Sequence, residues 1–227
     1  DRLRYSAPEG VLTPILRSQM RDFKSEILIF LQTTSLTAHL FKPIPSVPRN
    51  ENLPLSFAQQ RLWFLDQLEE ANATYNIPIA LRLKGQLNLN SLQLSIDTIV
   101  QRHETLRTSF QSVGGLASQV IAEQISIPLK ILDLQQFDPH TQNIEVQKLI
   151  QEEGQQPFEL NTLPLLRVKL LQLNPEEHVL LLTMHHIISD GWSMGVLVQE
   201  VTSLYKAFTT NTELTLPELQ IQYADFA

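Results

Sequence analysis

The chain has 227 residues, of which 43% are apolar and 18% charged, and its formal net charge is -7. This length allows one fairly large domain, or one domain with additional segments. The acidic balance without basic runs argues against binding to nucleic acid or to an anionic membrane surface. Cysteine is absent, which excludes disulfides, thiolate metal sites and a cysteine nucleophile and fits a cytoplasmic protein.

The first region, residues 1–32, predicts a small αβ segment. "RLRYSA" alternates like a short strand, and Thr13 and Pro14 are a favourable cap and first residue for a helix. Apolar residues follow at helical spacing, namely Ile15, Leu16, Met20, Phe23, Ile27, Leu28 and Leu31. Basic residues on the other side, Arg17, Arg21 and Lys24, are candidates to receive an acidic partner. A solvent-exposed helix face explains them equally well.

Residues 33–52 contain Pro43, Pro45 and Pro48 among polar residues, which predicts an extended linker. From residue 53 onward, segments with helical spacing alternate with strand-like segments. Helices are expected in "SFAQQRLWFLDQL", after a cap at Asn90, in "NIEVQKLIQEEG" with a stop at Gly154, and after "SDG". Strands are expected in "YNIPIALRLKG", "LRTSFQ", "PLKILDL" and the two segments that flank "NPEE". The order predicts a layered α/β fold in which helices cover a mixed sheet.

The segment "MHHIISDG" places two adjacent histidines before a sharp turn. On a strand, His186 would share a face with Met184, and His185 would face the opposite way. The two rings therefore cannot both reach one ion, and a metal site is disfavoured. The plainer interpretation is that both histidines pack in the core and that an ordinary turn follows them. The turn at Asp190 and Gly191 instead favours a functional site at the end of a strand.

The signature segment "HHIISDG", residues 185–191, resembles the HHxxxDG motif of the condensation domains of non-ribosomal peptide synthetases. "LPLSFAQQRLWFLDQL" resembles the first core motif of that family, and "RHETLRTSF" resembles the second. "YADFA" resembles the start of the fourth. The order and spacing agree over residues 53–227. The resemblance implies the N-terminal one of two lobes that are similar to chloramphenicol acetyltransferase, so we expect the chain to be part of a longer protein.

The resemblance also implies roles for the residues of the signature. His186 would be the catalytic histidine, as the base or the positioning group for an amine that attacks a thioester, and His185 a structural partner. Asp190 would pair with an arginine of the second motif, either Arg102, which we favour, or Arg107. Candidates to line the substrate tunnel are Gly191, Trp192 and Ser193. The competing interpretation for Trp192 is packing in the core, and that for Ser193 is a place at a helix start.

The first 32 residues resemble the latter part of a docking domain of the tubulysin synthetase type, which binds the C-terminal tail of an upstream synthase. The implied partners are that tail and the donor and acceptor carrier proteins, whose phosphopantetheine arms hold the substrates; no directly bound cofactor is implied. Three alternatives remain open: epimerisation, another acyl transfer with the same motif, and a non-catalytic module that only binds carriers or a docking tail. We expect the chain without the second lobe to be inactive.

Overall fold

The computed structural model describes residues 13–28, 43–49, 52–68, 72–213 and 216–227, which divide between two compact units, 1–44 and 45–227. The first unit contains helix α1 (Pro14–Asp22), and residues 24–28 are helical again. Thr13 caps α1 as predicted, because its hydroxyl oxygen accepts a bond from the Leu16 N–H at 3.2 Å. The predicted strand "RLRYSA" lies outside the described residues.

The second unit is built on a four-stranded sheet in the order β2-β7-β6-β5. The strands are β2 (Asn76–Lys84), β7 (Glu177–His185), β6 (Leu166–Asn174) and β5 (Lys130–Asp133). β2, β7 and β6 are antiparallel neighbours, and β5 joins β6 in parallel. The sheet is therefore mixed, as the sequence predicts.

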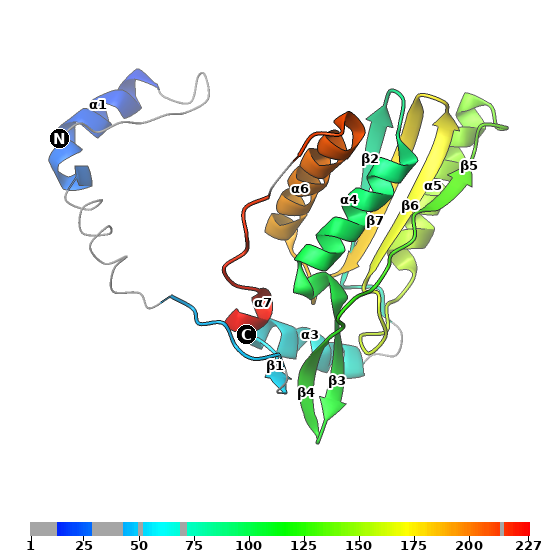
Figure 1. Ribbon diagram of the computed structural model, residues 1–227. Coiled ribbons are helices and arrows are strands. Elements are labelled where there is room, and N and C mark those ends of the chain that lie inside the picture. The colour runs from blue at the N-terminus through cyan, green and yellow to red at the C-terminus, as the bar shows by residue number, and fades with distance from the viewer. Residues whose placement is uncertain (1–12, 29–42, 50–51, 69–71, 214–215) are drawn as a thin grey trace. The chain divides into compact units, whose positions relative to one another are not determined.

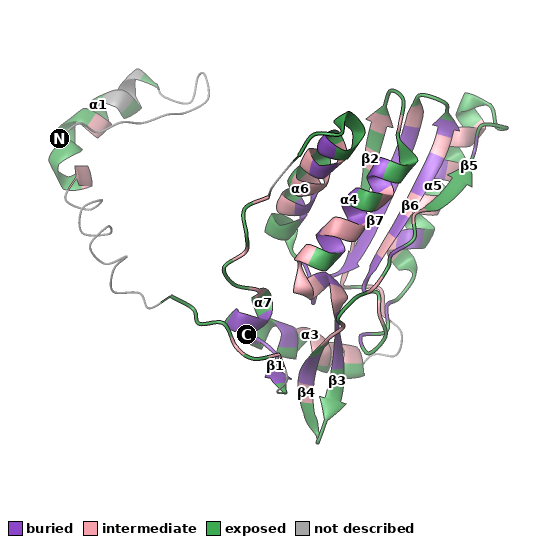
Figure 2. Cartoon of the chain, viewed as in Figure 1, coloured by how far each residue is buried: buried purple, intermediate pink, exposed green. Residues whose placement is uncertain are grey.

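Helices cover both faces of this sheet (Figure 1). Helices α4 (Leu89–Arg102) and α6 (Gly191–Thr210) pack on one face, and α5 (Pro139–Gln155) packs on the other. Along β7 the side chains alternate between two buried clusters: Leu182 and Met184 lie under α4 and α6, whereas Leu181 lies under α5. Figure 2 shows β7 buried along its length, so neither face of this strand is open to solvent.

Two predicted helix boundaries are wrong. Helix α4 is capped by Asn88 instead of Asn90, since the Asn88 side chain accepts a bond from the Ser91 N–H at 3.0 Å. Helix α5 continues past Gly154 to Gln155. A Cβ at Gly154 would lie 3.4 Å from the Pro78 side chain of β2, which is an ordinary contact, so packing on the sheet does not require a glycine here, and this residue does not end the helix.

A second, three-stranded sheet, drawn below the first in Figure 1, was not expected as a separate sheet. Its strands are β1 (Leu53–Pro54), β4 (Leu116–Ile121) and β3 (Thr108–Val113), in that order. β3 and β4 form a hairpin through Gly114 and Gly115, whose φ angles are 61° and 85°. Paired glycines with positive φ are a hairpin signal, so the sequence did contain the information that predicts β4.

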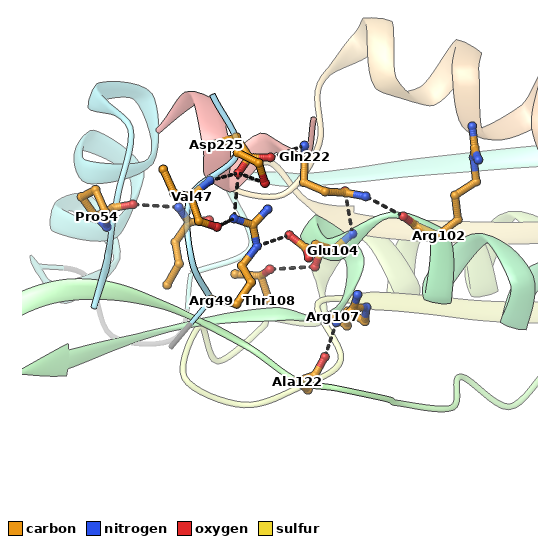
Figure 3. A network of polar contacts seen from close by, with 12 residues as sticks. Val47, Arg49, Pro54, Arg102, Glu104, Arg107, Thr108, Ala122, Gln222 and Asp225 are labelled. Carbon is orange, nitrogen blue, oxygen red and sulfur yellow. Dashed lines mark hydrogen bonds and ion pairs between the residues drawn. The ribbon is translucent and has the colours of Figure 1, made fainter. Parts of the chain in front are cut away.

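Short helices complete this lower part: α3 (Phe57–Leu68), η1 (Glu104–Arg107) and α7 (Tyr223–Phe226). A polar network joins η1 and α7 to residues 47–49 of the predicted linker (Figure 3). Arg49 binds Asp225 at 2.7 Å and Glu104 at 2.8 Å, and the Val47 N–H donates to Asp225. The end of the segment that was predicted as a linker therefore packs as part of the second unit.

Within the described residues, no helix is both long enough and apolar enough to cross a membrane.

Candidate functional site

The ring of His186 is exposed because strand β7 ends one residue earlier, at His185. The expectation that His186 continues the strand face of Met184 is wrong, since residue 186 already belongs to a turn. Its backbone N–H donates to the Tyr75 carbonyl at 2.8 Å, which keeps the turn beside the start of β2. Helices cover both faces of β7, so only a residue beyond the end of the strand can present its ring to solvent.

A hydrogen bond defines which nitrogen of His186 carries the proton. The ring Nδ1 lies 2.7 Å from the Ser189 carbonyl oxygen, which can only accept. Nδ1 is therefore protonated, and in the neutral ring Nε2 holds the lone pair. Nε2 has no hydrogen-bond partner within the part of the chain that the structure describes. The ring thus presents an accessible basic nitrogen in a fixed orientation.

His185 lies in a different environment, with only 1% of its surface exposed. Its ring makes edge contacts with Tyr75 and Phe158, each at a centroid distance of 6.3 Å. Burial, and to a smaller extent the neighbouring His186, lowers the pKa of His185 to about 4. The ring is therefore neutral at pH 7, and its Nδ1 accepts a bond from the Ile187 N–H at 3.1 Å. His185 packs and braces the turn and is not open to a substrate.

Asp190 does not form the expected ion pair with an arginine. Its carboxylate caps α6 by accepting from the Ser193 N–H at 2.8 Å and from the Ser193 hydroxyl at 2.6 Å. These two bonds lower the pKa of Asp190. Arg102 instead pairs with Glu200 at 3.3 Å, and Arg107 donates to a backbone carbonyl that follows β4. Asp190 is exposed, so water and a local cap satisfy it without a guanidinium.

The first turn of α6 projects beyond the sheet and carries the remaining candidates. Trp192 is 84% exposed, so the interpretation that it packs in the core is wrong. Ser193 bonds to the capping carboxylate, as expected at a helix start. A Cβ at Gly191 would meet no atom within 4 Å, and the backbone there has no positive φ. Neither packing nor backbone strain within the described residues therefore requires a glycine at this position.

The first two core motifs contribute side chains that the sequence reasoning missed. Gln59 of α3 donates to the Ile187 carbonyl at 3.4 Å, and Thr105 of η1 donates to the Ile188 carbonyl at 3.1 Å. A cavity of about 170 Å³ lies beside the Thr105 contact, lined in part by Thr105, Ser189 and Trp192. The available signal for Gln59 was its spacing of three and four residues from Leu62 and Trp63, which places a polar side chain on an apolar helix face.

In the first unit, Arg21 and Lys24 are exposed, whereas the side chain of Arg17 is outside the described structure. No cluster of three His, Cys, Asp or Glu residues suited to a metal ion occurs in the described ranges.

Comparison with known proteins gives two family matches. The model of the condensation domain matches residues 49–227, and the model of the TubC N-terminal docking domain matches residues 1–33. A polypeptide of the linear gramicidin synthase of Brevibacillus parabrevis is 49% identical over 185 residues, which are 82% of this chain and 2% of that protein. Malpibaldin synthetase of Mortierella alpina is 44% identical over 217 residues, which are 95% of this chain and 4% of that protein.

Solved structures agree with these matches. The X-domain from teicoplanin biosynthesis is similar with a TM-score of 0.72 and 28% identity, over 82% of this chain and 39% of that one. The starter condensation domain of rhizomide synthetase RzmA gives a TM-score of 0.69 and 25% identity, over 76% of this chain and 41% of that one. The chain thus spans less than half of these solved chains and a few per cent of the synthetases. It belongs to the condensation domain family of non-ribosomal peptide synthetases, with the fold related to chloramphenicol acetyltransferase, and its first 33 residues belong to the TubC docking domains.

Proposed function

We propose that this chain is the N-terminal lobe of a condensation domain that forms an amide bond between two carrier-bound substrates. The amine of the acceptor attacks the carbonyl carbon of the donor thioester, a C–N bond forms, and the C–S bond breaks. The donor's phosphopantetheine leaves as a thiol, and the nitrogen gives up a proton. One observation carries this proposal: an exposed His186 whose Nδ1–H is bound to a carbonyl and whose Nε2 lone pair is free.

His186 can act on the amine in two ways. As a general base, Nε2 takes the proton that the nitrogen releases, an effect of about 10²–10⁴-fold in rate when the base is well placed. As a positioning group, the same lone pair accepts a hydrogen bond from the amine and directs its attack. Both roles require the Nδ1–H tautomer.

The first turn of α6 supports the other half of the reaction. The N–H of Gly191 belongs to the first residue of the helix and has no partner within it. Such an N–H can polarise the thioester oxygen as negative charge develops there. The absence of a side chain at Gly191 leaves space for the thioester, and Trp192 and Ser193 extend the wall of the proposed tunnel.

The partners follow from the same assignment. Donor and acceptor carrier proteins deliver substrates on phosphopantetheine to a lobe over residues 53–227. A linker over 33–52, whose end packs on that lobe through Arg49, joins it to a partial docking domain over 1–32. The exposed cations Arg21 and Lys24, together with Arg17, suit an acidic C-terminal tail of an upstream synthase.

A non-catalytic binding module is the second candidate. It is supported by the likeness to the teicoplanin X-domain, which has been solved in a complex with OxyB, with a TM-score of 0.70 and 27% identity. In that case the lobe would present a protein surface, and His186 would do no chemistry. Epimerisation or another acyl transfer with the same signature would keep His186 in use but give a different product.

The test follows transfer between loaded carriers by intact-protein mass spectrometry, with this chain in its full-length protein. We expect the wild type to place the combined donor and acceptor mass on the acceptor carrier. His186→Ala is expected to abolish this product, while His140→Ala, an exposed histidine at the start of α5, leaves it unchanged. Product from His186→Ala would refute the assigned chemistry, and carrier binding without product from the wild type would favour the binding module.

The chain by itself is expected to give no product, because the second lobe would supply the other half of the tunnel. Turnover by the isolated 227 residues would contradict the two-lobe arrangement.

A further inference from the structure

Three successive backbone carbonyls of the signature turn, residues 186–190, each accept a side-chain hydrogen bond. The Ile187 carbonyl accepts from Gln59, the Ile188 carbonyl from Thr105, and the Ser189 carbonyl from the His186 ring. Two donors come from distant parts of the chain, whereas the third is the proposed catalytic ring itself. The orientation of the turn and the orientation of the ring are therefore linked.

The Gln59 amide has only one orientation that satisfies its neighbours. Gln59 is 2% exposed, and its Oε1 accepts from the Ser56 N–H at 3.0 Å. Its NH2 group must then face the other way, toward the Ile187 carbonyl and the Gln119 side-chain oxygen, both at 3.4 Å. Gln119 in turn donates to the Pro54 carbonyl at 2.7 Å. A buried amide with all its partners in place holds a single position.

Thr105 holds the next peptide group. Its hydroxyl donates to the Ile188 carbonyl at 3.1 Å, and Ile188 is itself buried. The Ile188 carbonyl and the Ser189 N–H belong to one planar peptide, so the hydroxyl fixes the plane that leads into Ser189. The rotation that this contact prevents would swing the Ser189 carbonyl away from the ring of His186.

We propose that Thr105 and Gln59 are positioning residues for His186: by fixing the carbonyls of the signature turn, they hold the Ser189 oxygen where it selects the Nδ1–H tautomer. Without that acceptor the ring is free to adopt the Nε2–H form, which has no lone pair toward the substrate. This inference rests on the function proposed for His186. It also gives a physical reason why side chains of the first and second core motifs contact the backbone of the third.

The test compares Thr105→Val, which keeps the shape and removes the hydroxyl, with Thr105→Ser, which keeps the hydroxyl. Gln59→Met removes the amide at similar length. Thr98→Val is the matched control, because its hydroxyl also donates to a carbonyl, that of Leu94 at 2.7 Å, away from the turn. Two quantities are measured: steady-state condensation with loaded carriers in the full-length protein, and the tautomer of His186 by ¹⁵N NMR of this chain.

For Thr105→Val we expect kcat to fall about tenfold with little change in KM, since a misplacement of about 1 Å costs up to about 100-fold. The ¹⁵N spectrum of His186 should show a new Nε2–H fraction. Gln59→Met should change both quantities in the same direction. Thr105→Ser should restore kcat to within about twofold of the wild type, and Thr98→Val should match the wild type.

Three results would overturn the proposal: unchanged kcat and tautomer in Thr105→Val, a lower kcat without a tautomer change, or an equal loss in Thr98→Val. Failure of the proposed function gives a different pattern. In that case His186→Ala keeps its activity, whatever the tautomer of His186 does in the Thr105 and Gln59 variants.

Discussion

Asp190 caps helix α6, and substitution at this position separates a capping role from an ion-pair role. The carboxylate accepts two bonds from Ser193, and no arginine pairs with it among the described residues. Asparagine is as good a cap as aspartate, whereas alanine cannot accept a hydrogen bond. We therefore compare Asp190→Asn with Asp190→Ala.

The structure sets the size of the two effects. Loss of an N-cap side chain costs about 0.5–2 kcal/mol of unfolding free energy, so we expect about 1 kcal/mol for Asp190→Ala. Asp190→Asn keeps the bond to the Ser193 N–H and loses only the attraction of the charge to the helix dipole, about 0.3 kcal/mol for an exposed group that salt screens. In a domain of this size, about 1 kcal/mol shifts the melting temperature by about 2–4 °C.

The assay is urea and thermal unfolding at neutral and acidic pH. The bonds from Ser193 lower the pKa of Asp190 in the folded state, so its contribution is present above the ordinary carboxyl pKa and is lost as the pH falls through the folded value. Asp138→Ala is the control, because the Asp138 carboxylate caps α5 by accepting from the His140 N–H at 3.0 Å. We expect it to lower the unfolding free energy about as much as Asp190→Ala does. If Asp190→Asn destabilises the fold as strongly as Asp190→Ala, a charged partner and not the cap is what matters.

Four further outcomes are expected. Glu153→Ala removes a buried carboxylate that lies between Arg167 and Lys169, and it should lower the free energy of unfolding by about 3–5 kcal/mol in urea. A cost below about 1 kcal/mol would mean that water solvates the two cations in the variant. The pKa of Asp225 is held well below its usual value by Arg49, so its stabilisation is present above the ordinary carboxyl pKa and is lost as the pH falls through the folded value. Asp225→Asn should flatten this acid dependence, and an unchanged pH profile would contradict the assignment. In an NMR titration, His185 should remain neutral down to a pH of about 4; a midpoint near 6.5 would show that its ring is solvated. Gly191→Ala should leave the unfolding midpoint unchanged, since a Cβ there meets open space, but should slow condensation; full activity would argue against close approach of the thioester.

The alternation of apolar residues was a reliable guide inside the sheet and failed at its end. It predicted that successive side chains of this strand face opposite ways, and the two buried clusters, one with Met184 and the other with Leu181, confirm this. It failed for His186 because a period of two holds only while the backbone is extended, and β7 ends at His185. The strand ends where bonds within the turn begin, the first running from the Ile188 N–H to the His185 carbonyl at 3.1 Å.

The pairing of Asp190 shows a related limit. Spacing alone could not distinguish an arginine partner from a local cap, because both satisfy a carboxylate. The structure brings Glu200 of α6 to Arg102, which removes that arginine from consideration. The cap was readable in principle from the three-residue spacing between Asp190 and Ser193.

By itself, the sequence determined the order of the main helices and of the strands of the four-stranded sheet, the mixed character of that sheet and the family, because these depend on local periodicity and on motifs that are contiguous in the chain. Only the tertiary structure decided which polar groups meet across long separations: Gln59 and Thr105 at the signature turn, and Arg49 at Asp225. Such contacts join residues tens to more than a hundred positions apart. No periodicity encodes them, because they follow from how the layers pack and from the need of each buried polar group for a partner.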